Sequence, residues 1–514
     1  MASTIQYAAI DVGSYEVEMA IYEISAKRGI KRIDHVRRIL SIGRESYRTG
    51  RISLQTCEEL CEVINGFLQL MKEYDVTAYD AYATSAVREA KNRRMVLDRI
   101  QITTGVKVKV LSNSEQRFLY YKALAARDNH FQELIQEGTA IIDVGFGSLQ
   151  ISLFDRGVLM TTQNIRLGAL RLREMLADVE GDSRTLNRLI EELVDNEIET
   201  FNKIFLEDLK VVHIIGVGNN ILHSVHSALG YMEGGENISA ENFTRFYENM
   251  MYMSPDALSH TLQIPEDYAT LLIPGTMVYQ RVLDITDADS IWAPDVCLCD
   301  GAAADYAAGK KMISLSHDFE NDIVQNAYVL SRRYRENTEH AALLDKVACE
   351  LYDSLKKYHG MGRRERLMLR ISAILHDCGK YVSLSASGDC AYHIIMSTEI
   401  IGLSHREREI IANVIRYNTM DFELDNPIPG MLTEEDFRVV AKLTAILRVA
   451  NATDRSHKQK FKDISVRMKD RELQIVLNTA EDIALEKGLF IPKADFFEEI
   501  YGIRPVLKKK RAQA

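Results

Sequence analysis

Residues 138–150, GTAIIDVGFGSLQ, predict a buried strand that runs into a glycine turn. The run 139–142 is β-branched and apolar, which is typical of a strand, and Asp143 stands where that run ends. Gly145 and Gly147 supply the backbone freedom that a tight loop around an anion requires. A second apolar strand follows, so N–H groups of the turn can cradle phosphate while the Asp143 carboxylate holds a hydrated divalent cation. An ordinary β-hairpin is the alternative, because a short glycine-rich match has low specificity.

A second copy of this pattern lies near the start of the chain. Residues 7–22, YAAIDVGSYEVEMAIY, contain the same tetrapeptide IDVG, with Asp11 and Gly13 in the places of Asp143 and Gly145. An alternating strand again follows the turn. Because each copy opens a segment of domain size, we expect an α/β fold of two similar lobes whose phosphate loops face each other across a cleft.

The composition describes a globular protein with material for several cores. The chain has 514 residues, 46% hydrophobic and 27% charged, and this length predicts two to four domains. A net charge of −11 argues against a general nucleic-acid-binding protein, because phosphate contacts need a basic surface. No apolar span reaches membrane length and MASTIQ lacks a signal pattern, so we expect a cytoplasmic protein without a membrane partner. The seven cysteines form no C-x-x-C pair, which favours buried thiols over a zinc ribbon.

Three domains follow from the order of the patterns. We expect a first lobe over residues 1–135 and a second lobe, with the second phosphate loop, over 136–312. In the second lobe, residues 165–173 predict a strand that ends in a glycine turn, and residues 296–305 predict a strand followed by a helix. Beyond the second lobe, strand signals fade and amphipathic helical patterns dominate, so 313–514 is expected to be all-helical.

Two charged residues of the first lobe lie where its strands are expected to end. Arg88 lies one turn into a helix that follows a short strand, a place suited to binding an anion. Glu115 lies in the first turn of a helix expected over 115–126, where it can deprotonate a water beside bound phosphate. Each has a simpler alternative: Arg88 as a surface helix residue, and Glu115 as a partner of the helix dipole.

Potential metal ligands also occur in the helical domain. His340 starts one helix, and the pair His376 and Asp377 follows an apolar run. Imidazole and carboxylate groups suit a divalent metal, although isolated histidines are more often structural. Both interpretations stay open at this point.

Together these segments resemble the exopolyphosphatase/guanosine pentaphosphate phosphohydrolase (Ppx/GppA) family, part of the sugar-kinase, heat-shock ATPase and actin superfamily. The last third of the chain is similar to the HD-type helical domain of that family, with EHAALLDKVA, AILHDCGK and LRVANATDRSH in corresponding places. The resemblance implies two actin-like (ribonuclease H-like) lobes around a cleft, followed by an all-α HD-type domain. Its motifs occur in the family's order over nearly the whole chain: AAIDVGS (8–14), TGRIS (49–53), ATSAVREAKN (83–92), IDVGFGS (142–148), LGALRL (167–172) and CDGAAAD (299–305).

The resemblance also implies roles for individual residues. Glu115, in SNSEQRFLYY (112–121), takes the place of the family's catalytic base if one residue is missing upstream, which leaves Arg117 matched. An ungapped alignment places Gln116 there instead. The metal, Mg²⁺ or another divalent cation, is held by Asp11 and Asp143. The implied phosphate-binding residues are Gly13, Ser14, Arg88, Gly145, Gly147 and Ser148.

Several positions depart from the family pattern. Phe146 replaces a glycine of the second loop, Gln150 replaces a glutamate that helps to bind metal and phosphate, and Tyr15 stands where asparagine is usual. In the helical domain, Asn451 stands where the last HD-type aspartate is expected, and Cys390 replaces a histidine. Fewer carboxylates predict weaker metal binding or an altered substrate preference.

The function that the resemblance implies is Mg²⁺-dependent hydrolysis of the terminal phosphate of inorganic polyphosphate. Two alternatives stay open: hydrolysis of guanosine pentaphosphate, and a non-catalytic protein of the same fold that senses polyphosphate or a nucleotide. The family also implies a homodimer. No nucleic-acid partner is expected.

Overall fold

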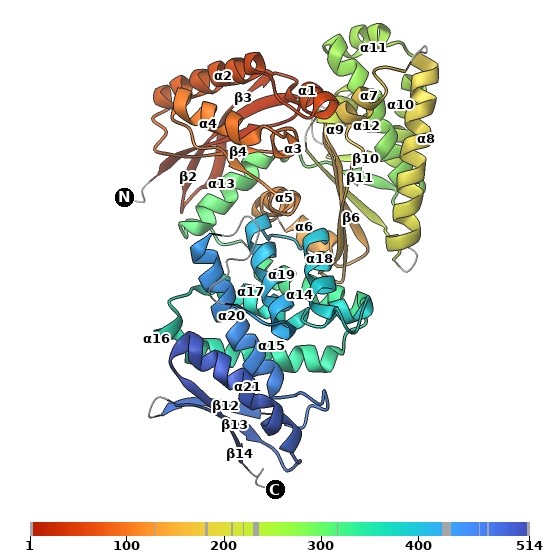
Figure 1. Cartoon of the computed structure of the whole chain (residues 1–514). Coiled ribbons are helices and arrows are strands. Elements are labelled where there is room, and N and C mark those ends of the chain that lie inside the picture. The colour runs from red at the N-terminus through yellow and green to blue at the C-terminus, as the bar shows by residue number, and fades with distance from the viewer. Residues whose placement is uncertain are drawn as a thin grey trace. The chain divides into compact units, whose positions relative to one another are not determined.

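The computed structural model describes residues 4–510 except 128, 180–182, 207–208, 219, 230–235, 316, 424–432, 462 and 470–471. The described residues form two compact units, one that ends at Phe319 and one that begins at Glu320. Figure 1 shows the helices and strands of each unit. None of the described helices is both long and apolar enough to cross a membrane.

The first unit begins with a five-stranded sheet. Its strands are β1 (Ile5–Val12), β2 (Glu16–Ser25), β3 (Gly29–Ile39), β4 (Ala78–Ala83) and β5 (Lys109–Val110), in the order β3-β2-β1-β4-β5. β1 and β2 form the first predicted hairpin, and β4 pairs parallel with β1. The helices of this part are α1 (Ile42–Thr49), α2 (Leu54–Glu73), α3 (Ser85–Glu89), α4 (Arg93–Thr104), α5 (Asn113–Arg127) and α6 (His130–Leu134).

Both faces of this sheet are buried, because side chains of β1 alternate between two cores. Ala8, Ile10 and Val12 pack in one core with α2 and α4, while Tyr7 and Ala9 pack in another with α13 (Leu298–Gly309). Figure 1 shows α2 and α4 on one side of the sheet and α13 on the other. The chain therefore returns to the first sheet after it has completed the second one.

The second sheet has six strands in the order β10-β11-β9-β6-β7-β8. They are β6 (Thr139–Val144), β7 (Leu149–Asp155), β8 (Val158–Ile165), β9 (His213–Val217), β10 (Asn237–Ser239) and β11 (Ser290–Trp292). β6 and β7 form the second predicted hairpin, and β9 pairs parallel with β6. The helices are α7 (Ala169–Met175), α8 (Ser183–Phe201), the π-helix η1 (Asn202–Leu206), α9 (Asn220–Ala228), α10 (Ala240–Met251), α11 (Pro255–Leu262) and α12 (Glu266–Asp284).

Helices cover both faces of the second sheet as well. Apolar side chains of α8, α9, α10 and α12 join those of β6 and β7 in one core. On the other face, the rings of Tyr121 and Phe131, from α5 and α6, contact the ring of Phe154 on β7. The architecture is the two-lobed α/β fold that the repeated hairpin predicted.

Two strand predictions in the second lobe were wrong. In 165–173 only Ile165 belongs to a strand, because Gly168 takes the N-cap position and α7 begins at Ala169. In 296–305 no strand is present, since Cys297 is the N-cap residue of α13 and its N–H donates to the Asp300 carboxylate. In both segments an apolar run proved to be a buried helix start, which a short run does not distinguish from a strand.

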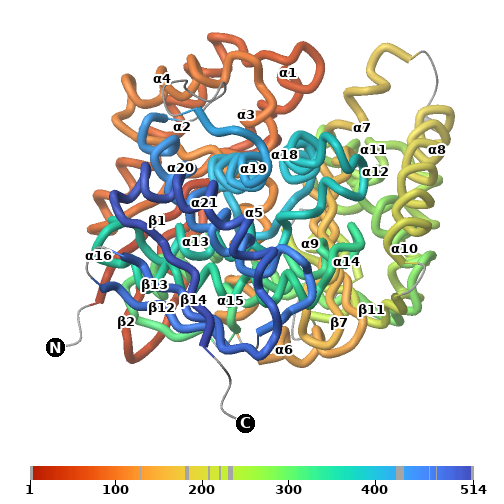
Figure 2. The backbone as a smooth tube through the Cα atoms, turned by 60° about the horizontal axis from the view of Figure 1, so that its bottom comes forward, coloured from red at the N-terminus to blue at the C-terminus, as the bar shows by residue number. Residues whose placement is uncertain are grey.

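The second unit is mainly helical, as expected, but it is not all-helical. β12 (Asp463–Lys469), β13 (Glu472–Asn478) and β14 (Arg504–Lys510) form a three-stranded sheet, and Figure 2 shows them side by side. β13 alternates between buried and half-buried residues, with Leu473, Ile475 and Leu477 inside. The helices are α14 (Phe319–Arg333), α15 (Thr338–Ser354), α16 (Lys356–His359), α17 (Arg363–Ile374), the 3₁₀ helix η2 (Cys378–Tyr381), α18 (Ser387–Ser397), α19 (His405–Thr419), α20 (Glu434–Ala452) and α21 (Ala484–Tyr501).

Candidate active site

The two glycine loops adopt the same turn. The N–H of Gly13 donates to the carbonyl oxygen of Glu16 at 3.0 Å, and the N–H of Gly145 donates to the carbonyl oxygen of Ser148 at 3.0 Å. Each turn closes an antiparallel hairpin in the middle of its sheet. The repeat found in the sequence is therefore also a repeat of backbone hydrogen bonding.

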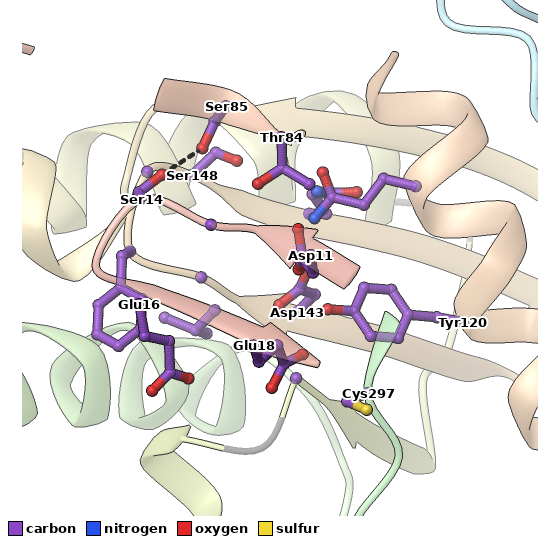
Figure 3. A pocket seen from close by; sticks show the side chains of 18 residues that line it. Asp11, Ser14, Glu16, Glu18, Thr84, Ser85, Tyr120, Asp143, Ser148 and Cys297 are labelled. Atoms are coloured by element: carbon purple, nitrogen blue, oxygen red, sulfur yellow. Dashed lines mark hydrogen bonds between the residues drawn. The ribbon is translucent and has the colours of Figure 1, made fainter. Parts of the chain in front are cut away.

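A pocket lies between the two loops, and Figure 3 shows it from close by. In that view the carboxyl groups of Asp11 and Asp143 lie near one another, and the hydroxyl of Tyr120 points toward Asp143. Seven of the nine predicted site residues line the pocket: Asp11, Gly13, Ser14, Asp143, Gly145, Gly147 and Ser148. The remaining lining residues are Glu16, Glu18, Thr84, Ser85, Gln116, Tyr120, Val144, Phe146, Gln150, Gly218 and Cys297.

The pocket is strongly acidic. Four carboxyl groups line it, from Asp11, Glu16, Glu18 and Asp143, and the described lining residues include no Lys or Arg. A phosphate chain is repelled by such a wall unless cations lie between the two. The pocket therefore suits a phosphate compound only together with metal ions.

Asp11 fits a role as a cation ligand. Its Oδ1 atom is buried and has no hydrogen-bond partner. Burial raises the pKa of Asp11 well above its usual range, the carboxylates of Glu18, Glu16 and Asp143 add to this, and Arg88 opposes it. A carboxylate oxygen without a donor, among other carboxylates, is stabilised by a divalent cation with oxygen ligands.

Asp143 is held in a similar but less acidic environment. Burial raises the pKa of Asp143 to about 7, and the guanidinium of Arg117 opposes this shift. Gly218, which has a φ of 77°, follows β9, and a Cβ at that position would come 2.5 Å from the Asp143 carboxylate. Glycine thus lets the loop after β9 approach this side chain. The oxygen-rich pair of Asp11 and Asp143 is a donor set that suits Mg²⁺.

Three hydroxyl groups meet beside the first loop. The Oγ of Ser14 lies 2.6 Å from the Tyr47 hydroxyl and 2.8 Å from the Oγ of Ser85, and the latter two lie 2.9 Å apart. A Cβ added to Gly147 would collide with Tyr47 and Ser85. This cluster therefore leaves room for the second loop only because residue 147 has no side chain.

Arg171 connects the two lobes next to these hydroxyls. Its Nε donates to the carbonyl oxygen of Gly147 at 2.6 Å, and its Nη2 pairs with Glu89 of α3 at 2.6 Å. The guanidinium also lies over the ring of Tyr47, 4.0 Å from the centroid. Arg171 belongs to the LGALRL segment, and its role in fixing the second loop was not predicted from the sequence.

The structure places Glu115 differently from the expectation. Glu115 lies in the first turn of α5, as predicted, but it does not line the pocket. Its carboxylate accepts from the Ser112 N–H at 3.0 Å and pairs with Lys109 at 2.8 Å. The neighbouring Gln116 lines the pocket instead, and its Oε1 is buried without a hydrogen-bond partner. The ungapped alternative, with Gln116 in the position of the base, is the one that agrees with this geometry.

Arg88 is also outside the pocket lining. Its guanidinium donates to the carbonyl oxygen of Leu111 at 2.7 Å and to the side chain of Asn113, where α5 begins. Its charge still reaches the site, because it lowers the pKa of Asp11. Arg88 thus positions the start of α5 and acts on the pocket through its field.

Glu18 is a lining residue that was not predicted from the sequence. It lies opposite Asp11 in the register of β1 and β2, and Gln150 lies opposite Asp143 in the register of β6 and β7. In both hairpins the partner follows the aspartate by seven residues, a spacing that was available in the sequence. Comparison of the two repeats residue by residue would therefore have found Glu18.

Two of the departures in the loops contact each other. The rings of Tyr15 and Phe146 lie 4.7 Å apart between centroids, and both are near the ring of Tyr268. Tyr15 is buried in a small apolar cluster with Leu170. The aromatic substitutions are thus mutually compatible, because they form a packed floor that links the two loops.

Comparisons with known proteins identify the family of this chain. The model of the Ppx/GppA phosphatase family matches residues 20–307, and the model of Ppx/GppA phosphatase domain III matches residues 325–491. A guanosine-5'-triphosphate,3'-diphosphate pyrophosphatase of Photobacterium profundum is 19% identical over 416 residues, which are 80% of this chain and 80% of that protein. Exopolyphosphatase 1 of Mycobacterium leprae is 26% identical over 204 residues, which cover 40% of this chain and 59% of that protein.

Solved structures show the same fold at low sequence identity. A Ppx/GppA family member of Aquifex aeolicus has a TM-score of 0.50 at 22% identity, over 62% of this chain and all of that one. An exopolyphosphatase of Cytophaga hutchinsonii has a TM-score of 0.51 at 16% identity, over 60% of this chain and all of that one. Since the first family model alone spans more than half of the sequence, the chain belongs to the Ppx/GppA phosphatase family.

Proposed function

We propose that this protein is a Mg²⁺-dependent phosphoanhydride hydrolase that releases the terminal phosphate of inorganic polyphosphate. The observation that carries the proposal is the acidic pocket between two equivalent phosphate loops, which has no basic lining residue among those described. Such a pocket accepts a polyanion only as a metal complex. The Mycobacterium leprae and Cytophaga hutchinsonii relatives named as exopolyphosphatases support the choice of substrate.

Asp11 and Asp143 would hold the cation in this proposal. A bound Mg²⁺ supplies charge neutralisation and orients the phosphate oxygens. The Ser14 and Ser148 hydroxyls and the N–H groups of the two turns would bind the remaining oxygens of the terminal phosphate. Tyr120 can add a donor, because burial raises the pKa of its hydroxyl well above the ordinary value and keeps it protonated.

Gln116 would position the attacking water. The carboxylate of Glu115 is turned toward Lys109 and the Ser112 N–H, whereas the side-chain carbonyl oxygen of Gln116 is buried and accepts no hydrogen bond. An amide oxygen can orient a water although it cannot remove its proton. Phosphoryl transfer through a loose transition state depends mainly on positioning and charge, so an orienting glutamine supports hydrolysis at a reduced rate.

Two other functions stay in view. Hydrolysis of guanosine pentaphosphate is supported by the relative of Photobacterium profundum, whose name gives that class of compound as its substrate. Gln116 favours a non-catalytic phosphate-binding role, because the side chain that lines the pocket at this position is an amide and cannot act as a general base. Both alternatives would use the same cation ligands, Asp11 and Asp143.

The test measures phosphate release from long-chain polyphosphate and from guanosine pentaphosphate. We expect release with Mg²⁺, none with EDTA, and recovery when Mg²⁺ is restored. The double variant Asp11→Asn/Asp143→Asn, prepared in the same way, distinguishes this activity from that of a contaminating phosphatase. Binding of labelled polyphosphate without release would overturn the enzymatic proposal in favour of a binding protein, and faster release from the nucleotide would change the substrate.

A further inference from the structure

The first unit contains a second cavity besides the acidic pocket between the phosphate loops. The second cavity has a volume of about 620 Å³, which lies in the range of small-molecule sites. Its walls come from the end of β8, from α7, and from α8 with the π-helix η1 that follows it, and Tyr47 of α1 completes the lining. The second cavity and the acidic pocket have no described lining residue in common. The two are therefore separate sites.

One part of the second cavity is apolar. Phe201 and Phe205 contribute two rings, whose centroids lie 5.3 Å apart, and Leu172 and Leu193 add aliphatic side chains. Phe201 is buried, whereas Phe205 is half-buried. Phe205 belongs to η1, and single π-helical turns of this kind occur frequently at functional sites. A wall with aromatic rings favours a ligand that has a flat apolar part.

The rest of the lining is polar, and its net charge is positive. Arg166 and Arg171 supply two guanidinium groups, and the described lining residues include one carboxyl group, from Glu197. Arg166 is exposed and forms no ion pair with a described residue. Gln163 and Asn196 add side-chain amides, each of which can both donate and accept hydrogen bonds. This part of the cavity suits a ligand with one anionic group and a polar edge.

Two lining residues of the second cavity also contact the phosphate loops. The Nε of Arg171 donates to the carbonyl oxygen of Gly147 at 2.6 Å, and the Tyr47 hydroxyl lies 2.6 Å from the Oγ of Ser14. The guanidinium of Arg171 lies over the ring of Tyr47, so the two side chains form one layer between the cavity and the loops. A ligand that contacts this layer is one hydrogen bond away from either loop.

We propose that the second cavity binds a purine nucleoside monophosphate and that its occupant regulates the acidic pocket. The base lies against the rings of Phe201 and Phe205, because aromatic side chains stack on any base. The amides of Gln163 and Asn196 meet its polar edge, since an amide can form two hydrogen bonds with a purine such as adenine. Arg166 binds the phosphate group by charge-assisted hydrogen bonds.

Other classes of ligand fit this lining less well. An inorganic phosphate chain has no apolar part to cover Phe201 and Phe205, and a simple aromatic carboxylate has no polar edge for the amides. The acidic pocket is the opposite case, with four carboxyl groups and no Lys or Arg among its described lining residues. That pocket accepts a phosphate compound only with metal ions, whereas the second cavity suits an organic anion without them.

The experiment measures binding of AMP to the full-length protein by isothermal titration calorimetry in EDTA. Without a divalent cation the acidic pocket repels the nucleotide, so the heat reports the second cavity. We expect one site with a dissociation constant below about 1 mM. Adenosine should bind at least about 10-fold more weakly, because it has no phosphate for Arg166. Absence of saturable AMP binding overturns the proposal outright, and an equal affinity for inorganic phosphate would show a simple anion site instead.

Variants then locate the bound nucleotide. Arg166→Ala should lower the affinity for AMP by about 10- to 100-fold and leave that for adenosine unchanged. Thr200→Trp places a large ring beside the cavity and should abolish binding of both; Thr200 is exposed on α8, so this variant is expected to fold. Arg188→Ala and Glu199→Trp, at exposed positions of α8 outside the lining, are the matched controls. Unchanged AMP binding in Arg166→Ala and Thr200→Trp would refute the assignment.

The regulatory part of this inference rests on the proposed function and has its own measurement. With Mg²⁺ and polyphosphate present, AMP should change the rate of phosphate release by the wild-type chain at least about fivefold. Thr200→Trp should have the wild-type rate and no response to AMP, since Thr200 does not line the acidic pocket. A wild-type rate that AMP leaves unchanged would overturn the regulation. If the chain releases no phosphate at all, the proposed function fails, while the titration in EDTA still decides the site.

Discussion

The two phosphate hairpins share a backbone but differ in charge. Asp11 faces Glu18 across β1 and β2, and Asp143 faces Gln150 across β6 and β7, in the same register. The aspartate and the turn are the same in both copies, while the cross-strand partner is a carboxylate in one and an amide in the other. The two hairpins therefore share their geometry and differ in charge.

Each partner side chain contacts a basic group that comes from outside the hairpin. Glu18 lies 2.9 Å from His35 and 3.4 Å from Arg37, and these contacts lower its pKa although burial alone would raise it. Gln150 accepts from the Nε of Arg117 at 3.2 Å. The first hairpin thus keeps an ionised carboxylate beside Asp11, whereas the second places a net positive charge beside Asp143. If the two aspartates hold a cation as proposed, this difference predicts that Asp11 is the principal ligand and Asp143 the auxiliary one.

The largest effect on phosphate release is expected when Asp11 and Asp143 are each replaced by asparagine in separate variants. Asp11→Asn should reduce Mg²⁺-dependent phosphate release by at least about 100-fold, because it removes the oxygen with no other partner. Asp143→Asn should be less severe and should be partly rescued by higher Mg²⁺. Release rates over a Mg²⁺ titration measure both effects, with Asp98→Asn on the exposed face of α4 as the control. Equal losses in both variants would show that the hairpins contribute equally.

The second prediction concerns Glu115 and Gln116, which lie in the first turns of α5. Gln116→Glu places a carboxylate in the pocket and should raise the rate of phosphate release by about 10- to 100-fold, since a general base replaces an orienting amide. Glu115→Gln should change the rate little, because the Glu115 carboxylate is bound to Lys109 and to the Ser112 N–H. The pair of variants is decisive in either direction: loss of activity in Glu115→Gln would restore Glu115 as the base.

This pair also shows where sequence reasoning reached its limit. The hairpins, their glycines and both aspartates were predicted, because a repeated motif fixes strand, turn and carboxylate together. Which of Glu115 and Gln116 lines the pocket was not predicted, because adjacent helical residues point about 100° apart and a one-residue gap in an alignment exchanges the two. The contacts of Arg171 were not predicted for another reason, since its partner Glu89 is far away in the sequence and its contact with Gly147 depends on how the loop folds.

The fold was predictable to a similar extent. Two lobes and a mainly helical last third follow from periodicity, whereas the β12-β13-β14 sheet was missed although β13 alternates clearly. The helix α21 separates β14 from β13 in the sequence, so the parallel pairing that completes the sheet does not follow from local periodicity. The proximity of His457 to His340 and His376 was not predicted either. The three residues are far apart in the sequence, and only the packing of α15, α17 and α20 brings them together.

The third prediction concerns the protonation of Asp143. The folded chain keeps the Asp143 proton up to a pKa of about 7, while the unfolded chain loses it near 3.8. The free energy of unfolding in EDTA should therefore fall as the pH rises from about 4 to about 7, by no more than about 4 kcal/mol from this residue. Asp143→Asn should flatten this part of the profile and stabilise the metal-free protein at pH 8. An unchanged slope in urea titrations would mean that Asp143 ionises normally.

The fourth prediction tests whether the two turns are equally tight. A Cβ at Gly13 would come 2.7 Å from the Glu16 carbonyl oxygen, whereas one at Gly145 would lie 3.4 Å from that of Ser148. Gly13→Ala should therefore destabilise the protein by about 1–3 kcal/mol, since a backbone atom must move. Gly145→Ala should be tolerated. Denaturant midpoints of the two variants give the comparison, and a Gly145→Ala variant that is the less stable of the two would reverse it.

The smallest effect is expected from restoring the missing carboxylate. Gln150→Glu makes the second hairpin resemble the first, yet its carboxylate would pair with Arg117, which already donates to this side chain. The ion pair with Arg117 would neutralise most of the added charge. We therefore expect the Mg²⁺ concentration for half-maximal release to fall only about two- to fivefold, which is under about 1 kcal/mol. Gln150→Leu removes the amide without adding charge and is the matched control. If Gln150→Glu instead lowered the Mg²⁺ requirement by a hundredfold, Arg117 would not be neutralising it, and the second hairpin would equal the first as a cation site.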